Sequence, residues 1–226
     1  MWKIVWERRK TQETKDQTLL QTLIMLNGFD TPPNMYSDSE WWDLVDQIVS
    51  ISDLTSRSKV LEIGCGSGAL IYGLKNRVDC EVFGIERSKT LYSIAKKNLP
   101  TATIFLMQAS KLHSVRGKYD LVLMHSVAQY FPDYKYFLKV IKFAEKLLYK
   151  NGKILLMDLP DRQFKGSINY LKSSSKSLKG PRHLYYDKVS ILRDLKGMNF
   201  ANIQEFDHIN KRYKNSSYRF NLMISR

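Results

Sequence analysis

The chain has 226 residues, of which 43% are hydrophobic and 12% aromatic, and it carries a formal net charge of +14. This composition excludes a disordered or fibrous protein, and no apolar run reaches the roughly 20 residues that a membrane-spanning helix needs. Two cysteines are too few for a disulfide framework, and the N-terminal apolar stretch is too short for a signal peptide. We therefore expect a cytoplasmic protein with no membrane partner.

The positive charge is concentrated in the last third of the chain. Residues 161–226 contain fourteen Lys and Arg against five Asp and Glu. Such a surface attracts acidic partners, either nucleic acid or a phosphorylated or carboxylated small molecule. Solubility alone also explains it, so the charge by itself does not select a function.

The sequence pattern predicts helices in the first fifty residues. Residues 11–26 predict a helix that breaks at Gly28 and the turn 31–34, and a second helix follows with Ser39 as its predicted N-cap. Apolar residues at positions 41, 44, 45, 48 and 49 share one face of this second helix. We expect residues 1–52 to form an N-terminal helical extension, a cap over the ligand site, and residues 53–226 to form the main domain.

Short apolar runs then alternate with helical segments. The pattern predicts strands at 59–63, 81–85, 102–107, 119–124 and 153–159, and helices at 69–77, 88–98 and 134–150. Strands that are apolar throughout and separated by helices form a parallel sheet covered on both faces. The sequence therefore predicts a Rossmann-like, doubly wound α/β domain.

The C-terminal part departs from this alternation. A Lys-rich and Ser-rich stretch at about 162–185 predicts a basic lid or insertion, and 187–197 predicts a helix with an Asp cap and a Gly stop. Two strands, 199–206 and 217–225, follow with no helix between them. Such strands must pair antiparallel or lie apart.

The first strand runs into a glycine-rich turn, "VLEIGCGSG", at residues 60–68. Glycine lets the backbone approach a ligand closely because it has no Cβ, and a helix N-terminus follows the turn. Gly64, Gly66 and Ala69 fit the dinucleotide fingerprint G-x-G-x-x-G/A, with Glu86 about twenty residues further on. An NAD(P)-binding oxidoreductase is therefore one alternative.

The same stretch resembles the first motif of the class I S-adenosylmethionine-dependent methyltransferases, particularly the small-molecule branch. That motif is an acid followed by Gly-x-Gly-x-Gly, and the resemblance extends from about Lys59 to Asp158. It implies a seven-stranded sheet, mostly parallel with a C-terminal antiparallel strand and helices on both faces. It also implies that the turn passes beneath the methionine part of S-adenosylmethionine, with Glu62, Gly64, Cys65, Gly66 and Gly68 at the cofactor.

Further cofactor contacts are expected where the next strands end. Glu86 ends the second strand, and its carboxylate can accept hydrogen bonds from both ribose hydroxyls. The resemblance places the adenine at "MQASKL", where Gln108 replaces the usual Asp and its carbonyl can still accept from the adenine amino group. Tyr36 is expected at the cofactor carboxylate. The remaining predicted cofactor contacts are Arg87, Ala109, Ser110 and His125.

Methyl transfer from a sulfonium is an in-line displacement that depends mainly on positioning. His125 falls at the carboxyl end of the fourth strand, where such sheets bind ligands, so it could touch the cofactor, position the acceptor or take a proton. A neutral hydroxyl or protonated amine needs a general base, for which the candidates are His125, His183 and Asp161. An anionic acceptor needs none.

The acceptor is expected to be a small, anionic metabolite methylated on O or N. The run "KGPRHLYYD" at 179–187 offers cations and tyrosines as an anion clamp. The predicted substrate-binding residues are Tyr130, Arg162, Arg182 and Tyr185, and no metal site is predicted. An RNA methyltransferase is the main alternative, because nucleic acid also binds basic surfaces, and a non-catalytic binder is another. The missing Asn-Pro-Pro-Tyr tetrad argues against the amide-methylating and adenine-amino-methylating branches.

Overall fold

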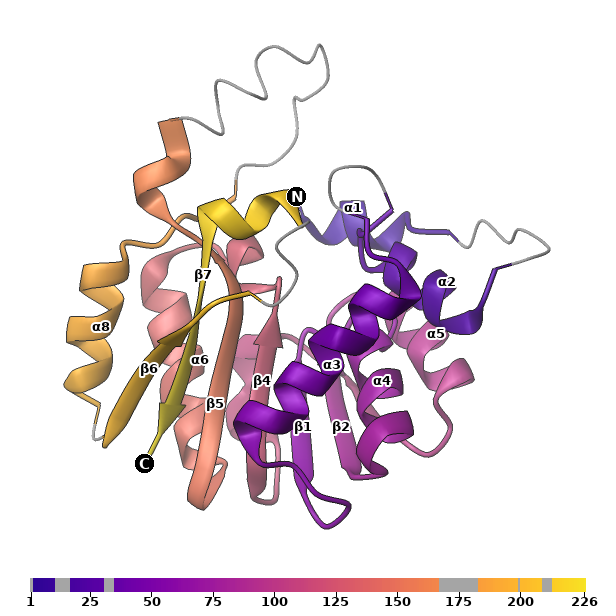
Figure 1. The fold of residues 1–226 in the computed structure, drawn as a ribbon, viewed down its shortest axis with the longest axis horizontal. Helices are drawn as coiled ribbons and strands as arrows, with labels where there is room; N and C mark the ends of the chain where they lie inside the picture. Colours follow the sequence, from indigo (N-terminus) through magenta and orange to yellow (C-terminus); the bar gives the residue numbers. More distant parts are fainter. Residues whose placement is uncertain (1, 11–16, 31–34, 167–182, 199, 209–212) are drawn as a thin grey trace.

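The computed structural model describes residues 2–10, 17–30, 35–166, 183–198, 200–208 and 213–226. Within them one seven-stranded sheet has the order β3-β2-β1-β4-β5-β7-β6 (Figure 1). Its strands are β1 Lys59–Ile63, β2 Glu81–Glu86, β3 Thr103–Leu106, β4 Tyr119–His125, β5 Leu148–Pro160, β6 Asn202–Phe206 and β7 Arg219–Ser225. Only β7 pairs antiparallel with its neighbours. The predicted Rossmann-like fold class is confirmed.

Helices cover both faces of this sheet. The α-helices are α1 Trp2–Glu7, α2 Leu19–Leu26, α3 Asp38–Ser52, α4 Ala69–Val78, α5 Lys89–Asn98, α6 Tyr134–Lys146 and α8 Lys188–Lys196. Because successive strand residues point to opposite faces, Leu121 and Leu123 of β4 join the core under α2, α3 and α4. Val122 and Met124 join the core under α6 and α8. The sheet is therefore buried on both sides.

The N-cap of helix α3 is Ser37 rather than the predicted Ser39. The Ser37 hydroxyl accepts a hydrogen bond from the Glu40 backbone N–H at 3.2 Å, and the Ser37 N–H donates to Glu40 Oε2 at 2.9 Å. This reciprocal pair is a capping box, which needs an acid three residues after the cap. Ser39 has no such acid and lies inside the helix.

Replacing Ser37 with alanine is expected to reduce the free energy of unfolding by about 1 kcal/mol, because the Glu40 backbone N–H loses its acceptor. For a chain of this length the melting temperature should fall by about 2–4 °C, measured by calorimetry. Ser39→Ala is the matched control and should change it by less than about 1 °C. Equal losses in the two variants would contradict the assignment of the cap.

The predicted helix 134–150 is too long. Helix α6 ends at Lys146, and residues 148–150 belong to β5. The Tyr119 N–H donates to the Leu147 carbonyl at 2.8 Å, and Leu148 pairs with Tyr119, so strand pairing overrides the helical pattern there. Residues 11–16 of the first predicted helix and most of the predicted lid lie outside the described residues.

The parallel strands all end at the upper edge of the sheet in Figure 1, and α1 lies over that edge. Ligands of open α/β sheets bind at this edge. No helix of the described chain is long and apolar enough to cross a membrane.

Candidate active site

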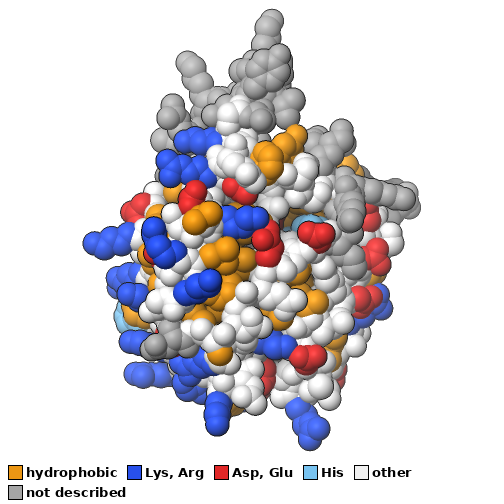
Figure 2. Space-filling view, turned by 60° about the vertical axis from the view of Figure 1, so that its left-hand side comes forward, with side chains coloured by type: hydrophobic (Ala, Val, Ile, Leu, Met, Phe, Trp, Pro, Cys, Tyr) orange, Lys and Arg blue, Asp and Glu red, His pale blue; other side chains and the backbone are white. Residues whose placement is uncertain are grey.

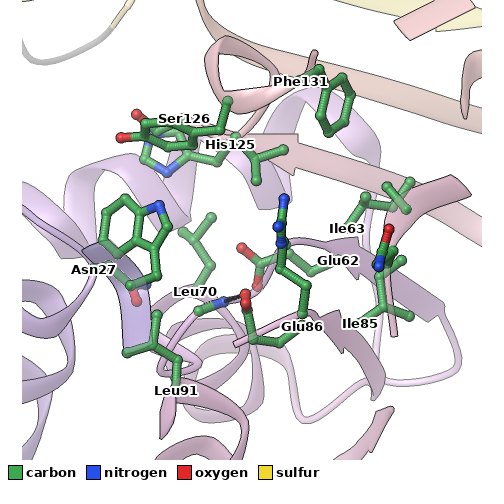
Figure 3. A pocket seen from close by; sticks show the side chains of 18 of the residues that line it. Asn27, Glu62, Ile63, Leu70, Ile85, Glu86, Leu91, His125, Ser126 and Phe131 are labelled. Atoms are coloured by element: carbon green, nitrogen blue, oxygen red, sulfur yellow. Dashed lines mark hydrogen bonds between the residues drawn. The ribbon is translucent and has the colours of Figure 1, made fainter. Parts of the chain in front are cut away.

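A cavity of about 410 Å³ opens where β1, β2, β3 and β4 end (Figure 3). Ligand sites in proteins typically have volumes of this order or larger. Its lining combines residues from the ends of the strands with three aromatic residues of the N-terminal extension. The lining includes Trp6, Asn27, Phe29, Trp41, Glu62, Gly64, Gly66, Glu86, Arg87, Gln108, Ala109, His125, Ser126, Tyr130 and Phe131.

The glycine turn has a conformation that other residues rarely adopt. Gly64, Gly66 and Gly68 have φ angles of +75°, +59° and +89°. A Cβ on Gly64 would come within 2.2 Å of Val127 Cγ2, and one on Gly66 within 2.1 Å of Asn27 Oδ1. Glycine is therefore required both by the backbone and by the packing. The Gly64 and Gly66 backbone forms one wall of the cavity.

Asn27 holds this turn from the side. Its Oδ1 accepts hydrogen bonds from the Ser67 N–H at 2.7 Å and from the Ser67 hydroxyl at 2.9 Å. Sequence reasoning missed Asn27, because an Asn before Gly28 indicates only the end of a helix. Its partner lies forty residues away, and no local pattern reveals it.

The Glu86 carboxylate links the glycine turn to the start of α5. Its Oε2 accepts from the Gly66 N–H at 2.9 Å, and its Oε1 accepts from the Ser88 N–H at 2.6 Å. Burial raises the pKa of Glu86, and these backbone donors oppose the rise. The Arg87 backbone N–H also donates to this carboxylate, so three of its roughly four acceptor sites are used and one is left for a ligand hydroxyl. This geometry is compatible with the predicted ribose contact.

Glu62 is buried, and its Oε2 has no hydrogen-bond partner among the described residues. Burial, and then the nearby Glu86, raise the pKa of Glu62 to about 8. The two carboxyl groups lie close together in the cavity lining (Figure 3). Because buried polar groups are nearly always paired, the free Glu62 oxygen indicates a place for a polar ligand.

Glu62 should make the stability of the ligand-free protein depend on pH. A folded-state pKa of about 8, above the ordinary value of 4.5, means that ionisation destabilises the fold as pH rises from 4.5 to 8. Glu62→Gln cannot ionise, so its stability relative to wild type should be higher at pH 9 than at pH 4 by about 3–5 kcal/mol. Urea unfolding at both pH values measures this difference, and a gain independent of pH would contradict it.

His125 ends β4 and lies against aromatic rings. Its ring stacks on Phe29 with 5.6 Å between centroids and meets Trp41 edge-on at 5.8 Å. Burial lowers the pKa of His125 to about 4, although the nearby Asp158 acts to raise it. The imidazole is therefore neutral at pH 7. Its buried Nε2 has no hydrogen-bond partner in the described part of the chain.

The other two predicted catalytic residues lie outside the cavity lining. Asp161 is buried, and its carboxylate accepts from the Gln163 N–H at 3.0 Å and from Gln163 Nε2 at 2.8 Å. His183 is one residue removed from the lining, because its ring meets Tyr130 edge-on at 5.4 Å and Tyr130 lines the cavity. Their catalytic roles stay predictions.

Some of the remaining predicted site residues line the cavity and others do not. Those in the lining are Arg87, Gln108, Ala109 and Tyr130. Tyr36 is buried and its hydroxyl hydrogen-bonds His208 Nε2 at 3.0 Å, away from the lining. Arg182 lies outside the described residues. Those that are described but do not contribute to the lining are Tyr36, Cys65, Gly68, Ser110, Arg162 and Tyr185.

Helix α1 covers the cavity. Trp6 lines it and meets the Tyr130 ring edge-on at 5.2 Å. The Glu7 carboxylate accepts from the Lys89 and Thr90 N–H groups at 3.0 and 3.2 Å, at the start of α5. A carboxylate at a helix N-terminus satisfies free donors and the helix dipole. The sequence "MWKIVWERRK" predicts none of these contacts, because all of them are long-range.

Residues 60–152 match a family model described as Methyltransferase domain. The predicted resemblance to the class I S-adenosylmethionine-dependent methyltransferases is confirmed. The matched residues contain the glycine turn, Glu86 and His125.

Two fungal synthetases are among the relatives of this chain. The nonribosomal peptide synthetase dtxS1 of Metarhizium robertsii is 33% identical over 123 residues, and the PF 1022-synthetase of a Rosellinia species is 30% identical over 132 residues. Each match covers 51% of this chain. The chain spans only 2% and 4% of the length of these relatives.

Solved structures show the same fold. The magnesium protoporphyrin IX methyltransferase ChlM of Synechocystis PCC 6803, with bound S-adenosylhomocysteine, is 18% identical with a TM-score of 0.63. That match covers 100% of this chain and 92% of ChlM. DesVI of Streptomyces venezuelae is 12% identical with a TM-score of 0.61, over 83% of this chain and 92% of DesVI.

Proposed function

We propose that this protein transfers a methyl group from S-adenosylmethionine to a small molecule. The observation that carries the proposal is the cavity inside the methyltransferase domain, where the glycine turn meets Glu62 and Glu86. The predicted enzyme class and cofactor are confirmed by the family match, and the neighbour ChlM has been solved with S-adenosylmethionine and with S-adenosylhomocysteine bound.

The residues present fit this cofactor. Glu86 would accept from a ribose hydroxyl, Gln108 and Ala109 would meet the adenine, and the unpartnered Glu62 oxygen would accept from a donor at the methionine end. Bound S-adenosylmethionine supplies an electrophilic methyl group on a sulfonium. Trp6 and Phe29 in the lining would exclude water from the reacting atoms.

Transfer requires the acceptor to approach in line with the bond between methyl carbon and sulfur. The acceptor's lone pair forms the new bond, and the electron pair of the breaking bond stays on sulfur. The neutral His125 could accept a proton, but a pKa of about 4 makes it a weak base near pH 7. Positioning at the end of β4 is therefore its stronger contribution.

A small acceptor is favoured by the size of the cavity, which the cofactor would already occupy in large part. The names of the relatives, peptide synthetases and a magnesium protoporphyrin IX methyltransferase, also favour small-molecule chemistry. We retain an anionic acceptor as part of the proposal. Its support is Arg87 in the lining, His183 beside Tyr130 and the basic C-terminal third.

An RNA acceptor is the second candidate, because of a basic face on α6. Figure 2 turns the left side of Figure 1 forward and shows many Lys and Arg side chains toward its left and lower left. Helix α6 has four exposed lysines spaced along one side, and it begins beside the cavity-lining Tyr136. These lysines are Lys135, Lys139, Lys142 and Lys146. RNA binding that weakens steeply with salt would favour this candidate.

The test begins with calorimetric titration of S-adenosylmethionine, S-adenosylhomocysteine and NADH. Binding of the first two and not of NADH is expected, and the reverse would support an oxidoreductase. Release of S-adenosylhomocysteine is then followed across small acceptors and a structured RNA. Cofactor binding with no release from any acceptor would indicate a non-catalytic binder.

A further inference from the structure

Four residues form a closed ring of hydrogen bonds beside the cavity, and the ring closes through the Asp158 backbone carbonyl. The Ser126 hydroxyl donates to Asp158 Oδ2, and Gln129 Nε2 donates to Ser126 Oγ at 3.2 Å. Arg219 Nη1 donates to Gln129 Oε1 at 2.7 Å and to the Asp158 carbonyl at 3.0 Å. The Asp158 side chain is 0% exposed and the Arg219 side chain 10%. We call these residues the β4–β5 ring.

The backbone at this ring is unusual. Ser126 follows β4 with a φ of +55°, and Asp158, in the adjacent strand β5, has a φ of +62°. Positive φ costs a residue with a side chain about 1–2 kcal/mol, and such residues cluster at functional sites. Here the paired side chains and the guanidinium of Arg219 hold both residues in place. Only Ser126 of the four lines the cavity.

The hydrogen-bond direction gives Ser126 a defined polarity. A serine hydroxyl has one proton and two lone pairs. The proton goes to Asp158 Oδ2, which also accepts from the Tyr213 hydroxyl at 3.2 Å and lies 3.7 Å from Arg219 Nη1. One lone pair accepts from Gln129. Ser126 therefore offers the cavity a single acceptor site and no donor.

We propose that Ser126 Oγ accepts a hydrogen bond from the nucleophilic N–H or O–H group of the methyl acceptor, and that Asp158 is the positioning residue that fixes this polarity. The inference rests on the proposed function and deepens it. A group bound through its N–H or O–H keeps its lone pair free for attack, whereas a donating serine would occupy that lone pair. A carboxylate has no proton to offer and is excluded as the nucleophile.

The lone pair of the amine or hydroxyl forms the bond to the methyl carbon, and the carbon–sulfur bond breaks with its electrons remaining on sulfur. A neutral amine gives up its N–H proton to water when the methylated product leaves the cavity. A hydroxyl gives its proton to the neutral His125, which lines the same cavity and returns the proton to water after product release. Ser126 keeps its own proton throughout, because that proton is held by Asp158.

The test uses acceptors that carry competing nucleophiles in one molecule. Amino acids and hydroxy acids are incubated with the protein and S-adenosylmethionine, and mass spectrometry locates the methyl group. Wild type should give N-methyl or O-alkyl products and no methyl ester. Ser126→Ala should lower kcat/KM by about 10- to 100-fold, with the calorimetric Kd for S-adenosylhomocysteine within twofold of wild type.

Asp158→Asn tests the positioning role through the choice of methylated atom, which a purely structural role of Asp158 would leave unchanged. The new amide can donate to Ser126 Oγ, so the serine proton is released toward the cavity. The ratio of methyl ester to N-methyl or O-alkyl product should therefore rise. Asp194→Asn is the matched control, because Asp194 lies in α8, outside the cavity lining, and accepts from the Tyr134 hydroxyl and from Arg193 Nε. Its products should equal those of wild type.

The outcomes separate the inference from the proposed function. Methyl esters from wild type, no product on any N–H or O–H group, or loss of S-adenosylhomocysteine binding in Ser126→Ala would overturn the inference. The last result would assign Ser126 to the cofactor. Wild type that binds neither S-adenosylmethionine nor S-adenosylhomocysteine would instead refute the proposed function. If circular dichroism shows that Asp158→Asn does not fold, the kinetics of Ser126→Ala and the products of the wild type still test the inference.

Discussion

Replacing Gly64 with alanine is expected to reduce the affinity for S-adenosylhomocysteine by more than about 100-fold, which corresponds to about 2.7 kcal/mol. The φ of +75° disfavours any side chain, and the new Cβ would lie 2.2 Å from Val127 Cγ2. Either the turn or the loop after β4 must move, and both line the cavity. The same strain should cost about 2–5 kcal/mol of folding stability.

Calorimetric titration measures the affinity, and urea unfolding measures the stability. Gly166→Ala is the control, because a Cβ there meets nothing within 4 Å. Gly64→Ala combined with Val127→Ala should recover part of the loss, since it removes the collision but leaves the φ angle. Wild-type affinity in Gly64→Ala would show that the turn does not hold the cofactor.

Replacing Glu86 with alanine should have the second largest effect. We expect the Kd for S-adenosylhomocysteine to rise by about 100-fold, because hydrogen bonds to a charged acceptor contribute about 1.5–3 kcal/mol each. Part of this loss is indirect, since the Gly66 and Ser88 N–H groups also lose their acceptor. Glu86→Gln keeps the shape and one acceptor oxygen, so its loss should be smaller.

Glu81→Gln is the matched control for this series. Glu81 begins the same strand, is exposed and pairs with Lys59 at the surface. Its replacement should leave the affinity unchanged. Unchanged affinity in Glu86→Ala would remove the ribose assignment, even if the glycine turn proves essential.

The fold could be predicted from sequence because the strands are apolar throughout and separated by helices of ordinary length. The runs 59–63 and 81–85 lie within one residue of β1 and β2. The errors fall where a partner distant in sequence decides the structure. Leu148 pairs with Tyr119 as part of β5, so the helical pattern that continues past Lys146 does not form a helix.

The candidate site was predictable where a strand ends in a chemically distinctive residue. Glu86 and His125 both end strands, and the rule for parallel sheets places them at the cavity. Trp6, Asn27 and Arg219 were missed, because each depends on a long-range contact. Arg219 contacts Asp158 only because β7 pairs with β5, and the local hydrophobic pattern of the sequence does not predict which strands pair.

The contact between Glu7 and the start of α5 has a practical consequence for anyone who extends this polypeptide. Residues joined ahead of α1 would emerge beside the helix whose Trp6 lines the cavity. Residues joined after Arg226 would emerge at the opposite edge of the sheet (Figure 1). An affinity tag, or a neighbouring module in a fusion, therefore belongs at the C-terminal end.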